Sequence, residues 1–471
     1  MAPNAPPFFV CQSCGASAPK WLGRCPECGE WNSYVEQITR VEAPAAAAGK
    51  PRAARLSELS PRAEGRLETG LPGLDRVLGG GLVAGSVVLV GGEPGIGKST
   101  LLLQAARGIA AHAGDVLYAA GEESAEQVRL RADRLGVSED GLFVLAETDA
   151  ERVVAEAAAR PLGAVFVDSI QSLRHAALTS APGTVSQVRE CAGVLVNYAK
   201  ERGVPVVLVG HVTKDGSLAG PKSLEHLVDA VVAVDGERGS SRRILRATKN
   251  RFGAVDEVAL YEMTAAGLVE IANASAALLS ERRSGLPGSA VIATREGTRS
   301  LLLEVQALVG PVTAGSPRRV AIGVDGGRLA LLLAVLERAG VSISSREVFV
   351  SCAGGFEVTE PAADLAVVAA LLSSVSGRPL PASAVFFGEI GLLGEVRRVP
   401  AAPARLREAA ALGFERVYMP SRNAQEAASP ARIRLCPVER VSELVKELGT
   451  SSVSSARTTS RSGAGPIESD G

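Results

Sequence analysis

Nine consecutive residues near position 95 carry the clearest chemistry in this sequence. Gly92-Glu93-Pro94-Gly95-Ile96-Gly97-Lys98-Ser99-Thr100 has the spacing of a Walker A phosphate loop. The glycines let successive backbone N–H groups turn toward an anion. Lys98 suits the β- and γ-phosphates of a nucleotide, and the Ser99 hydroxyl suits Mg²⁺. Because an apolar run precedes the loop and a helical run follows it, we expect this stretch to bind ATP and Mg²⁺.

Further polar residues directly follow apolar runs of strand length. Asp168 follows four apolar residues and fits a Walker B carboxylate that holds Mg²⁺. Glu122 follows another run and is the candidate that orients and deprotonates the attacking water, with Glu123 as the alternative. Acidic capping of the next helix competes with this role, above all for Glu123. His211 follows a third run and is a candidate sensor of the γ-phosphate, although a lone histidine is more often structural.

Basic residues downstream of the loop suggest contacts with a neighbouring subunit and with nucleic acid. Lys249 and Arg251 alternate at a predicted strand end, so we expect both to point outward, toward a neighbour's nucleotide. There they would neutralise charge on the γ-phosphate; ordinary surface charge is the alternative. Lys214 and Lys222 lie in a glycine-rich stretch that either grips a phosphate backbone or is a plain solvated loop.

These residues form three sets of candidates. The catalytic candidates are Lys98, Glu122, Asp168, Lys249 and Arg251. The candidates for binding ATP and Mg²⁺ are Gly92, Glu93, Pro94, Gly95, Ile96, Gly97, Lys98, Ser99, Thr100, Asp168 and His211. The DNA-binding candidates are Lys214, Lys222, Lys249 and Arg251.

Four cysteines near the N-terminus form two Cys-x-x-Cys pairs, Cys11 with Cys14 and Cys25 with Cys28. Two such pairs complete a tetrahedral four-sulfur Zn²⁺ site, which is structural because it leaves no open position. Gly15 and Gly29 follow each pair, where the turn requires a positive φ. Two disulfides are the alternative. Trp21 and Trp31 either contact a partner or DNA, or pack this small domain.

Strand-length and helix-length patterns alternate after the phosphate loop, as in a doubly wound α/β domain with a parallel sheet. Predicted strands lie at 86–90, 116–119, 142–145, 164–167 and 204–209, and predicted helices at 100–106, 124–135, 150–160 and 185–202. Shorter runs at 230–234, 244–248 and 258–261 suggest that hairpins extend the sheet. The sheet places the candidate carboxylates at its carboxyl edge.

Composition narrows the class of protein. The 471 residues exceed one ordinary core, and 46% of them are hydrophobic, as in well-packed globular domains. A net charge of −1 requires any nucleic-acid binding to rest on local basic patches. We find no run of membrane-span length and no signal peptide, and we expect a soluble, cytoplasmic protein. The single cysteines Cys191, Cys352 and Cys436 lie in apolar segments and are expected to be inert.

Four features occur in a fixed order along the chain: the cysteine pairs, the phosphate loop, Asp168 and Lys249-Asn250-Arg251-Phe252-Gly253. This order resembles the RadA (Sms) family of bacterial DNA repair proteins. The resemblance runs from Cys11 to about Leu448 and implies an ATPase core similar to RecA and DnaB. It also implies a hexameric ring that hydrolyses ATP, binds single-stranded and branched DNA and drives branch migration. Recombinase or replication proteins are implied partners. Lys249 and Arg251 match the basic pair that acts in trans in such rings.

The C-terminal third resembles the proteolytic domain of Lon. In that family a nucleophilic serine follows the proline of a stretch that reads Glu360-Pro361-Ala362-Ala363-Asp364 here, and Ala362 takes its place. Arg397 stands where the general-base lysine would fall. A methyl group cannot attack a carbonyl and a protonated arginine cannot act as a base, so we expect no peptidase activity. The hypothesis that remains is a scaffold that assembles rings and presents four arginines to DNA, namely Arg397, Arg398, Arg405 and Arg407.

Five segments follow from these assignments. They are a four-cysteine zinc finger at 8–36, a flexible linker at 37–60, a RecA-like ATPase domain at 61–275, a Lon-protease-like domain without its catalytic dyad at 285–448, and a disordered tail at 449–471. The favoured interpretation is a DNA-dependent ATPase motor. The alternative, from another class, is an ATP-switched factor that remodels or scaffolds proteins. Stimulation of hydrolysis by single-stranded DNA would separate the two.

Overall fold

The computed structural model describes ten stretches of the chain. They are residues 8–11, 15–37, 65–138, 140–211, 223–236, 240–255, 257–296, 299–312, 315–353 and 356–448. The chain divides into two compact units, Met1–Ala277 with Arg295–Arg299, and Leu278–Thr294 with Ser300–Gly471. None of the helices in these stretches combines the length and apolar character that a membrane crossing requires.

The N-terminal residues form a small three-stranded sheet. Its antiparallel strands are β1 (Phe8–Cys11), β2 (Ser17–Ala18) and β3 (Tyr34–Gln37), in the order β2-β1-β3. Two cysteine side chains, Cys11 and Cys25, make up much of its buried cluster, together with Ala18 and Tyr34. Trp21 and Trp31 are both more than half exposed, so they do not form its core.

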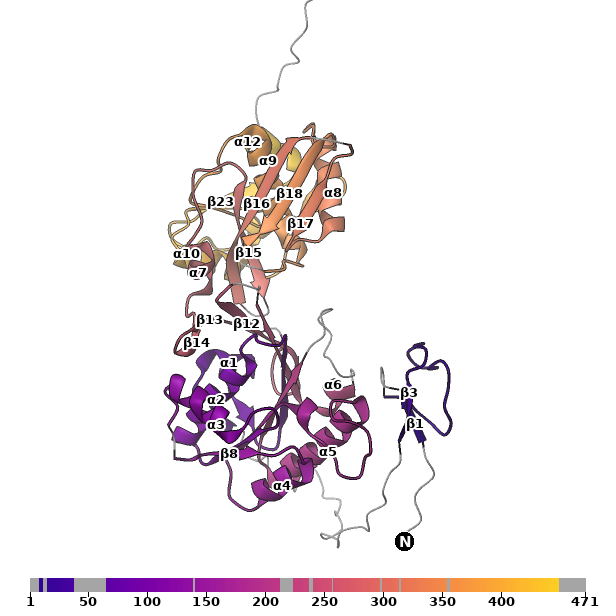
Figure 1. Cartoon of the computed structure of the whole chain (residues 1–471). Coiled ribbons are helices and arrows are strands. Elements are labelled where there is room, and N and C mark those ends of the chain that lie inside the picture. The colour runs from indigo at the N-terminus through magenta and orange to yellow at the C-terminus, as the bar shows by residue number, and fades with distance from the viewer. Residues whose placement is uncertain are drawn as a thin grey trace, which may run out of the picture. The chain divides into compact units, whose positions relative to one another are not determined.

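A nine-stranded sheet organises the rest of the first unit (Figure 1). Its order is β14-β13-β12-β11-β6-β10-β9-β7-β8, and the six strands from β11 to β8 are parallel. The strands are β6 (Val87–Gly92), β7 (Val116–Ala120), β8 (Leu142–Ala146), β9 (Ala164–Asp168), β10 (Val206–His211), β11 (Ala230–Asp235), β12 (Arg242–Asn250), β13 (Val258–Thr264) and β14 (Gly267–Glu270). A short pair, β4 (Arg66–Leu67) and β5 (Leu82–Val83), lies apart from it.

Helices cover both faces of this sheet, which confirms the doubly wound α/β class. One apolar cluster joins the sheet to α1 (Pro72–Val77), α2 (Lys98–His112) and α3 (Ala125–Arg134). The other joins it to α4 (Ala150–Ala158), η2 (Ile170–Ser172), α5 (Val185–Arg202) and α6 (Ser223–Leu227). The prediction that 142–145 is a buried strand is wrong in part. Because β8 lies at the edge of the sheet, Val144 is exposed.

The second unit contains a seven-stranded mixed sheet in the order β17-β18-β16-β15-β19-β22-β23. These strands are β15 (Ser289–Glu296), β16 (Arg299–Pro311), β17 (Arg319–Ile322), β18 (Arg346–Cys352), β19 (Ala384–Phe386), β22 (Arg416–Pro420) and β23 (Arg434–Val438), and β20 (Glu389–Ile390) pairs separately with β21 (Val396–Arg397). The helices from its boundary onward are α7 (Ala274–Leu279), α8 (Gly326–Arg338), η4 (Pro361–Ala363), α9 (Asp364–Ser376), α10 (Ala402–Ala411), α11 (Ser421–Glu426) and α12 (Val441–Leu448).

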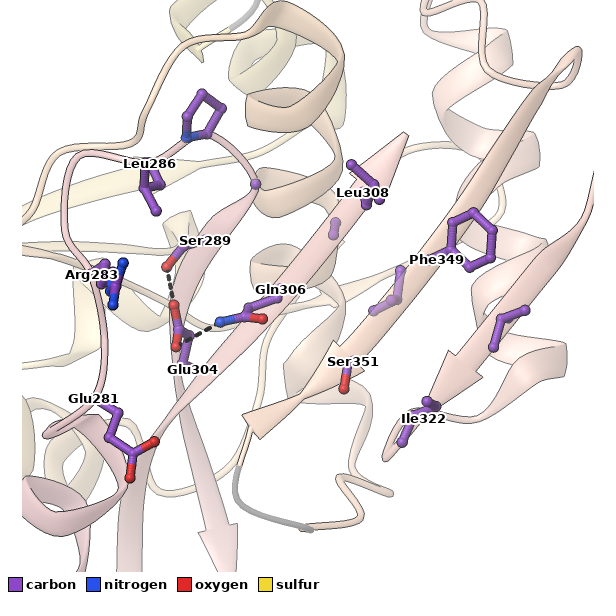
Figure 2. A pocket seen from close by; sticks show the side chains of 15 residues that line it. Glu281, Arg283, Leu286, Ser289, Glu304, Gln306, Leu308, Ile322, Phe349 and Ser351 are labelled. Atoms are coloured by element: carbon purple, nitrogen blue, oxygen red, sulfur yellow. Dashed lines mark hydrogen bonds between the residues drawn. The ribbon is translucent and has the colours of Figure 1, made fainter. Parts of the chain in front are cut away.

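One part of this second sheet leaves an apolar face open. Val348 and Val350 on β18 are buried, whereas Phe349 between them lies on the opposite, partly exposed face. The strand register places Leu308 of β16 and Val320 of β17 on either side of Phe349. Figure 2 shows Leu308 and Phe349 at this surface, which lines a hollow of about 510 Å³ with Leu286 at its rim. The packing of the sheet thus leaves an exposed apolar row across three strands.

Candidate nucleotide site

The phosphate loop connects β6 to α2, as its sequence predicts. Gly95 and Gly97 have φ values of 78° and 114°, which side chains strongly disfavour. A Cβ atom on Gly97 would also lie 2.5 Å from Cε of Met263, and one on Gly92 would lie 2.6 Å from the carbonyl oxygen of Val234. Backbone conformation therefore favours glycine at 95 and 97, and close packing against backbone favours it at 92.

Lys98 begins α2 and is almost fully buried, at 5% exposure. Its Nζ donates hydrogen bonds to the carbonyl oxygens of Gly92, at 2.8 Å, and Glu93, at 2.9 Å. Burial lowers the pKa of Lys98, and the charges of Asp168 and Glu122 oppose that shift. The ammonium group is thus held inside the loop and close enough to both acids to interact with them.

Asp168 ends β9 at the carboxyl edge of the sheet. It lies beside Ala120 of the parallel strand β7, and its backbone oxygen accepts a hydrogen bond from Gly121 at 2.9 Å. One side-chain oxygen, Oδ2, accepts a hydrogen bond of 2.7 Å from the phenol of Tyr118. Burial and the Asp168 charge raise the pKa of Tyr118 well above its ordinary value, so the phenol stays protonated and donates. Tyr118 lies within an apolar run, so the sequence does not predict its hydrogen bond to Asp168.

The two neighbouring acids after β7 have different surroundings. Glu122 is exposed and accepts a hydrogen bond from the buried Ser169 hydroxyl. Glu123 forms an ion pair with Arg131 of α3. The helix is capped by Ser124, whose hydroxyl accepts from Gln127 N at 3.3 Å in a capping box. Neither acid is the N-cap residue, Glu123 is paired with the next helix, and Glu122 stays the candidate for activating the attacking water.

The donor set suits a nucleoside triphosphate with Mg²⁺. Gly92, Gly95 and Gly97 shape a loop in which added side chains would clash or strain the backbone, and such loops hold phosphates through N–H groups. Lys98 supplies a positive charge, while Ser99 and Asp168 supply the hard oxygen ligands that Mg²⁺ prefers. Bound Mg²⁺ would neutralise charge on the phosphates and provide a template for in-line attack.

Arg243 on β12 supports the phosphate loop in a way that sequence reasoning missed. Its Nε donates a 2.8 Å hydrogen bond to the carbonyl oxygen of Ile96. Nη1 of the same guanidinium binds the backbone oxygen of Ser240 at 2.6 Å. Arg243 lies almost 150 residues after the loop, so only the fold brings it there. From the sequence alone, a basic residue on an amphipathic strand is predicted to be an exposed surface charge.

Lys249 and Arg251 converge on one segment of their own chain. Nζ of Lys249 donates hydrogen bonds to the backbone oxygens of Glu225 and, at 2.7 Å, Val228. Burial and the neighbouring Arg251 charge lower the pKa of Lys249. Arg251 contacts the carboxylate of Asp229 at 3.2 Å, yet 54% of its side chain stays exposed. Of the two cations, Arg251 therefore has the more accessible charge.

Three candidates cannot be placed as side chains. Lys214 and Lys222 lie outside the residues that the structure describes, as does the side chain of His211. The backbone of His211 ends β10, where it pairs with Gly92 of the phosphate loop. This position is compatible with a sensor at the same edge of the sheet.

Three of the four predicted metal ligands come together in the N-terminal sheet. The Sγ atoms of Cys11, Cys25 and Cys28 all lie within 4.8 Å of one another, and Cys14 lies outside the described residues. Cys11 and Cys28 are 3.7 Å apart at sulfur, too far for a disulfide and close to the ~3.8 Å expected for two thiolates on one tetrahedral Zn²⁺. Gly15 and Gly29 both have a φ of 76°, as predicted for these turns.

The cysteines outside this cluster lie in the two larger folds. Cys191 and Cys352 are buried, and burial raises the pKa of each thiol to about 12. Cys436 is partly buried, and burial raises its pKa as well. High thiol pKa values disfavour the reactive thiolate. The raised pKa values favour the protonated form of all three thiols.

The four arginines of the second unit differ from expectation in one respect. Arg397, Arg398 and Arg407 are exposed, but Arg405 is fully buried, so the prediction that it is presented to DNA is wrong. Its guanidinium makes two hydrogen bonds to the Glu360 carboxylate, at 2.8 and 2.7 Å, and one to the Ala293 carbonyl at 2.5 Å. Arg405 therefore ties α10 to the segment that precedes η4.

A separate polar hollow of about 720 Å³ carries exposed arginines. Arg397 and Arg398 line it, together with Arg422 and Arg440. Glu395 and Glu439 lie in the same lining, and Arg398 forms an ion pair with Glu426 at 2.9 Å. Arg422 and Arg440 were not singled out by sequence because they are scattered along the chain. The fold gathers four cations around one hollow.

Comparisons with known proteins match both the small domain and the nucleotide domain. A model described as an AAA domain matches residues 53–217, and one described as a rubredoxin metal binding domain matches residues 9–36. DNA repair protein RadA of Bacillus subtilis (strain 168) is 46% identical over 446 residues, which cover 93% of this chain and 97% of the relative. DNA repair protein RadA of Pseudomonas aeruginosa is 48% identical over 449 residues, covering 94% and 98%. A solved structure of the RadB recombinase, 22% identical, covers 44% of this chain and 99% of its own, with a TM-score of 0.36.

Proposed function

Since this chain belongs to the RadA family of DNA repair proteins, we propose that it is a ring-shaped motor that moves on single-stranded DNA. It is a RecA-like ATPase of DNA repair and recombination. The motor would be a hexamer that couples hydrolysis to branch migration of recombination intermediates. The observation that carries this proposal is the convergence of Lys98, Glu122 and Asp168 at one edge of the sheet, while Arg251 extends a charge outward.

Each of these residues has a part in hydrolysis that follows from its surroundings. Lys98 neutralises phosphate charge, and Ser99 with Asp168 holds Mg²⁺. Glu122 orients and deprotonates the attacking water, since its carboxylate is exposed and is held by Ser169. Lys249 and Arg251 act on the nucleotide of the neighbouring subunit, where a cation stabilises charge on the γ-phosphate. Supporting this, Arg251 keeps more than half of its side chain exposed.

DNA contacts are proposed for two regions. Lys214 and Lys222 are candidates that line the channel of the ring. In the second unit, Arg397, Arg398 and Arg407 are exposed, and the first two share a hollow with Arg422 and Arg440. Guanidinium groups on such a surface suit phosphate oxygens. Zn²⁺ on the four cysteines would stabilise the N-terminal domain, and recombinase or replication proteins are the proposed partners.

The second unit is proposed to be a scaffold rather than a protease. Ala362 is buried and carries only a methyl group where the resemblance places the nucleophile. Arg397 forms ion pairs with Glu395 at 2.6 Å and Glu389 at 3.7 Å, and an arginine side chain does not serve as a general base. Neither side chain can perform the expected step of peptide hydrolysis.

A second candidate function is an ATP-switched factor that remodels or scaffolds proteins. The observation that favours it is the open apolar face with Leu308 and Phe349, together with the exposed Trp21 and Trp31. Exposed apolar groups of this kind are common at protein interfaces. Under this alternative, DNA would leave the rate of hydrolysis unchanged.

The test is ATP hydrolysis with and without single-stranded DNA, for the unaltered protein, Lys98→Ala and Arg251→Ala, with size analysis of each. We expect DNA to stimulate the unaltered protein and each variant to lose at least about 100-fold in turnover. Arg251→Ala should keep its affinity for nucleotide, because its target lies in the neighbour. Hydrolysis that DNA does not change would favour the remodelling factor. Normal hydrolysis by Arg251→Ala in a normal ring would contradict the role in trans.

A further inference from the structure

The carboxyl ends of β7 and β9 are joined by two side-chain hydroxyl groups. The phenol of Tyr118 on β7 donates to Asp168 at the end of β9. In the opposite direction, the hydroxyl of Ser169 after β9 donates to Glu122 after β7. Each candidate catalytic acid is thus held by a hydroxyl group from the other strand.

The hydroxyl of Tyr118 adds a contact that packing alone does not need. Its ring belongs to the apolar cluster between the sheet and α1–α3, where a phenylalanine would fill the same space. The oxygen atom, however, lies 2.7 Å from Oδ2 of Asp168. A donor at this position takes up one carboxylate oxygen and restricts rotation of the carboxylate, which leaves Oδ1 for other contacts.

We propose that Tyr118 is a positioning residue for ATP hydrolysis, which fixes the Asp168 carboxylate so that its second oxygen serves Mg²⁺. This rests on the proposed role of Asp168 as the Walker B acid. The residues that orient metal ligands commonly matter almost as much as the ligands. Tyr118 would not touch nucleotide or metal, and its effect passes through Asp168.

The variant Tyr118→Phe tests this with a readout other than turnover. Affinity for a fluorescent ATP analogue is measured with EDTA and across a Mg²⁺ titration. We expect unchanged affinity in EDTA, and an increase of about 10-fold in the Mg²⁺ concentration needed for half-maximal tight binding. The Mg²⁺ dependence of hydrolysis should move by a similar factor.

Tyr198→Phe is the matched control. Tyr198 is also buried in the nucleotide domain, and its phenol donates to the backbone oxygen of Ala157 at 3.1 Å, away from the candidate acids. It should lose a similar hydrogen bond with no change in Mg²⁺ dependence. An equal shift in both variants would mean that loss of a buried hydroxyl loosens the domain generally, and would overturn the positioning role.

Asp168→Asn separates failure of this inference from failure of the proposed site. If Asp168→Asn loses the Mg²⁺ response and Tyr118→Phe keeps it, Asp168 holds the metal without help from Tyr118, and the inference alone falls. If Asp168→Asn responds to Mg²⁺ normally, the Walker B assignment and the inference both fall. The inference also requires that Tyr118→Phe add nothing to the defect of Asp168→Asn in the double variant.

Discussion

Arg405 and Arg407 lie two residues apart on α10 and have opposite environments. Arg405 is fully buried and forms a bidentate salt bridge with Glu360, whereas Arg407 is exposed. A buried charge that loses its partner is costly, while an exposed arginine can approach a phosphate at little cost. The two residues therefore allow stability and the proposed DNA contact to be tested separately within one turn of helix.

Arg405→Met should lower the free energy of unfolding by about 3 kcal/mol, because Glu360 loses its guanidinium partner. Arg407→Met should leave stability unchanged, weaken DNA binding several-fold and reduce the slope of log affinity against log salt by about one. Thermal unfolding and DNA affinity at several salt concentrations measure both effects. A stable Arg405→Met would show that the salt bridge contributes little. An unchanged affinity in Arg407→Met would remove this side of α10 from the DNA surface.

Helix interiors offer a second pair of residues, Gly108 in α2 and Gly193 in α5. Alanine is favoured over glycine within a helix by about 1 kcal/mol. A Cβ atom on Gly108, however, would lie 2.0 Å from the carbonyl oxygen of Thr69, whereas one on Gly193 would meet nothing within 4 Å. Overpacking against backbone outweighs helix propensity at the first site only.

We therefore expect Gly108→Ala to destabilise the nucleotide domain by about 2 kcal/mol and to lower its Tm by roughly 4–8 °C. Gly193→Ala should stabilise the same domain by up to about 1 kcal/mol. Thermal unfolding followed by circular dichroism compares them, with nucleotide affinity as a check on the fold. A Gly108→Ala protein as stable as the original would mean that the turn at Thr69 yields without cost.

The sequence predicts the elements of the nucleotide domain well, since buried parallel strands are continuous apolar runs. The strand from Val116 and the helix from Val185 begin where the pattern places them. The phosphate loop is predictable because its glycine, lysine and serine spacing is a pattern of neighbouring residues. The predictions of nucleotide, DNA repair and RecA-like character are confirmed by the relatives.

What the sequence does not predict depends on contacts between distant segments. Tyr118 resembles a core residue in its apolar strand, and only the pairing of β7 with β9 brings it to Asp168. Arg405 resembles a surface charge on an amphipathic helix, but Glu360 and Ala293 meet it across more than 40 and 110 residues. Neither contact has a local signal, because each partner is chosen by the tertiary fold.

At the scale of the whole molecule, mixing two inactive variants tests whether Arg251 acts on the nucleotide of a neighbouring subunit. Lys98→Ala lacks the phosphate-loop charge but keeps Arg251. Arg251→Ala keeps Lys98 but lacks the arginine. If Arg251 acts on the neighbour's nucleotide, some interfaces of a mixed ring contain both intact parts. Random mixing in equal amounts should restore about one quarter of the original turnover. Half of the subunits have an intact phosphate loop, and half of their neighbours have an intact Arg251.

Co-expression of the two variants, followed by ATPase assays on the purified mixture, provides the measurement. Each variant expressed alone is the control and should remain inactive. Recovery well above both controls supports action in trans. A mixture as inactive as either variant, with normal size, would place Arg251 in its own subunit's chemistry.

The strand β12 connects the phosphate loop of its own subunit to Lys249, one of the two cations proposed to act in trans. Arg243 near its start holds the phosphate loop through Ile96, and Lys249 lies near its end, roughly 20 Å along the strand. β13 pairs with residues Arg242–Arg246 of this strand, and β11 pairs with Ile244–Asn250 with a register shift between Val231 and Val232. Under the proposed action in trans, a displacement of one phosphate loop would be passed along β12 toward Lys249 and the next nucleotide. If Lys249 acts on the neighbouring nucleotide as proposed, β12 carries the support of one phosphate loop at one end and a contact to the next active site at the other.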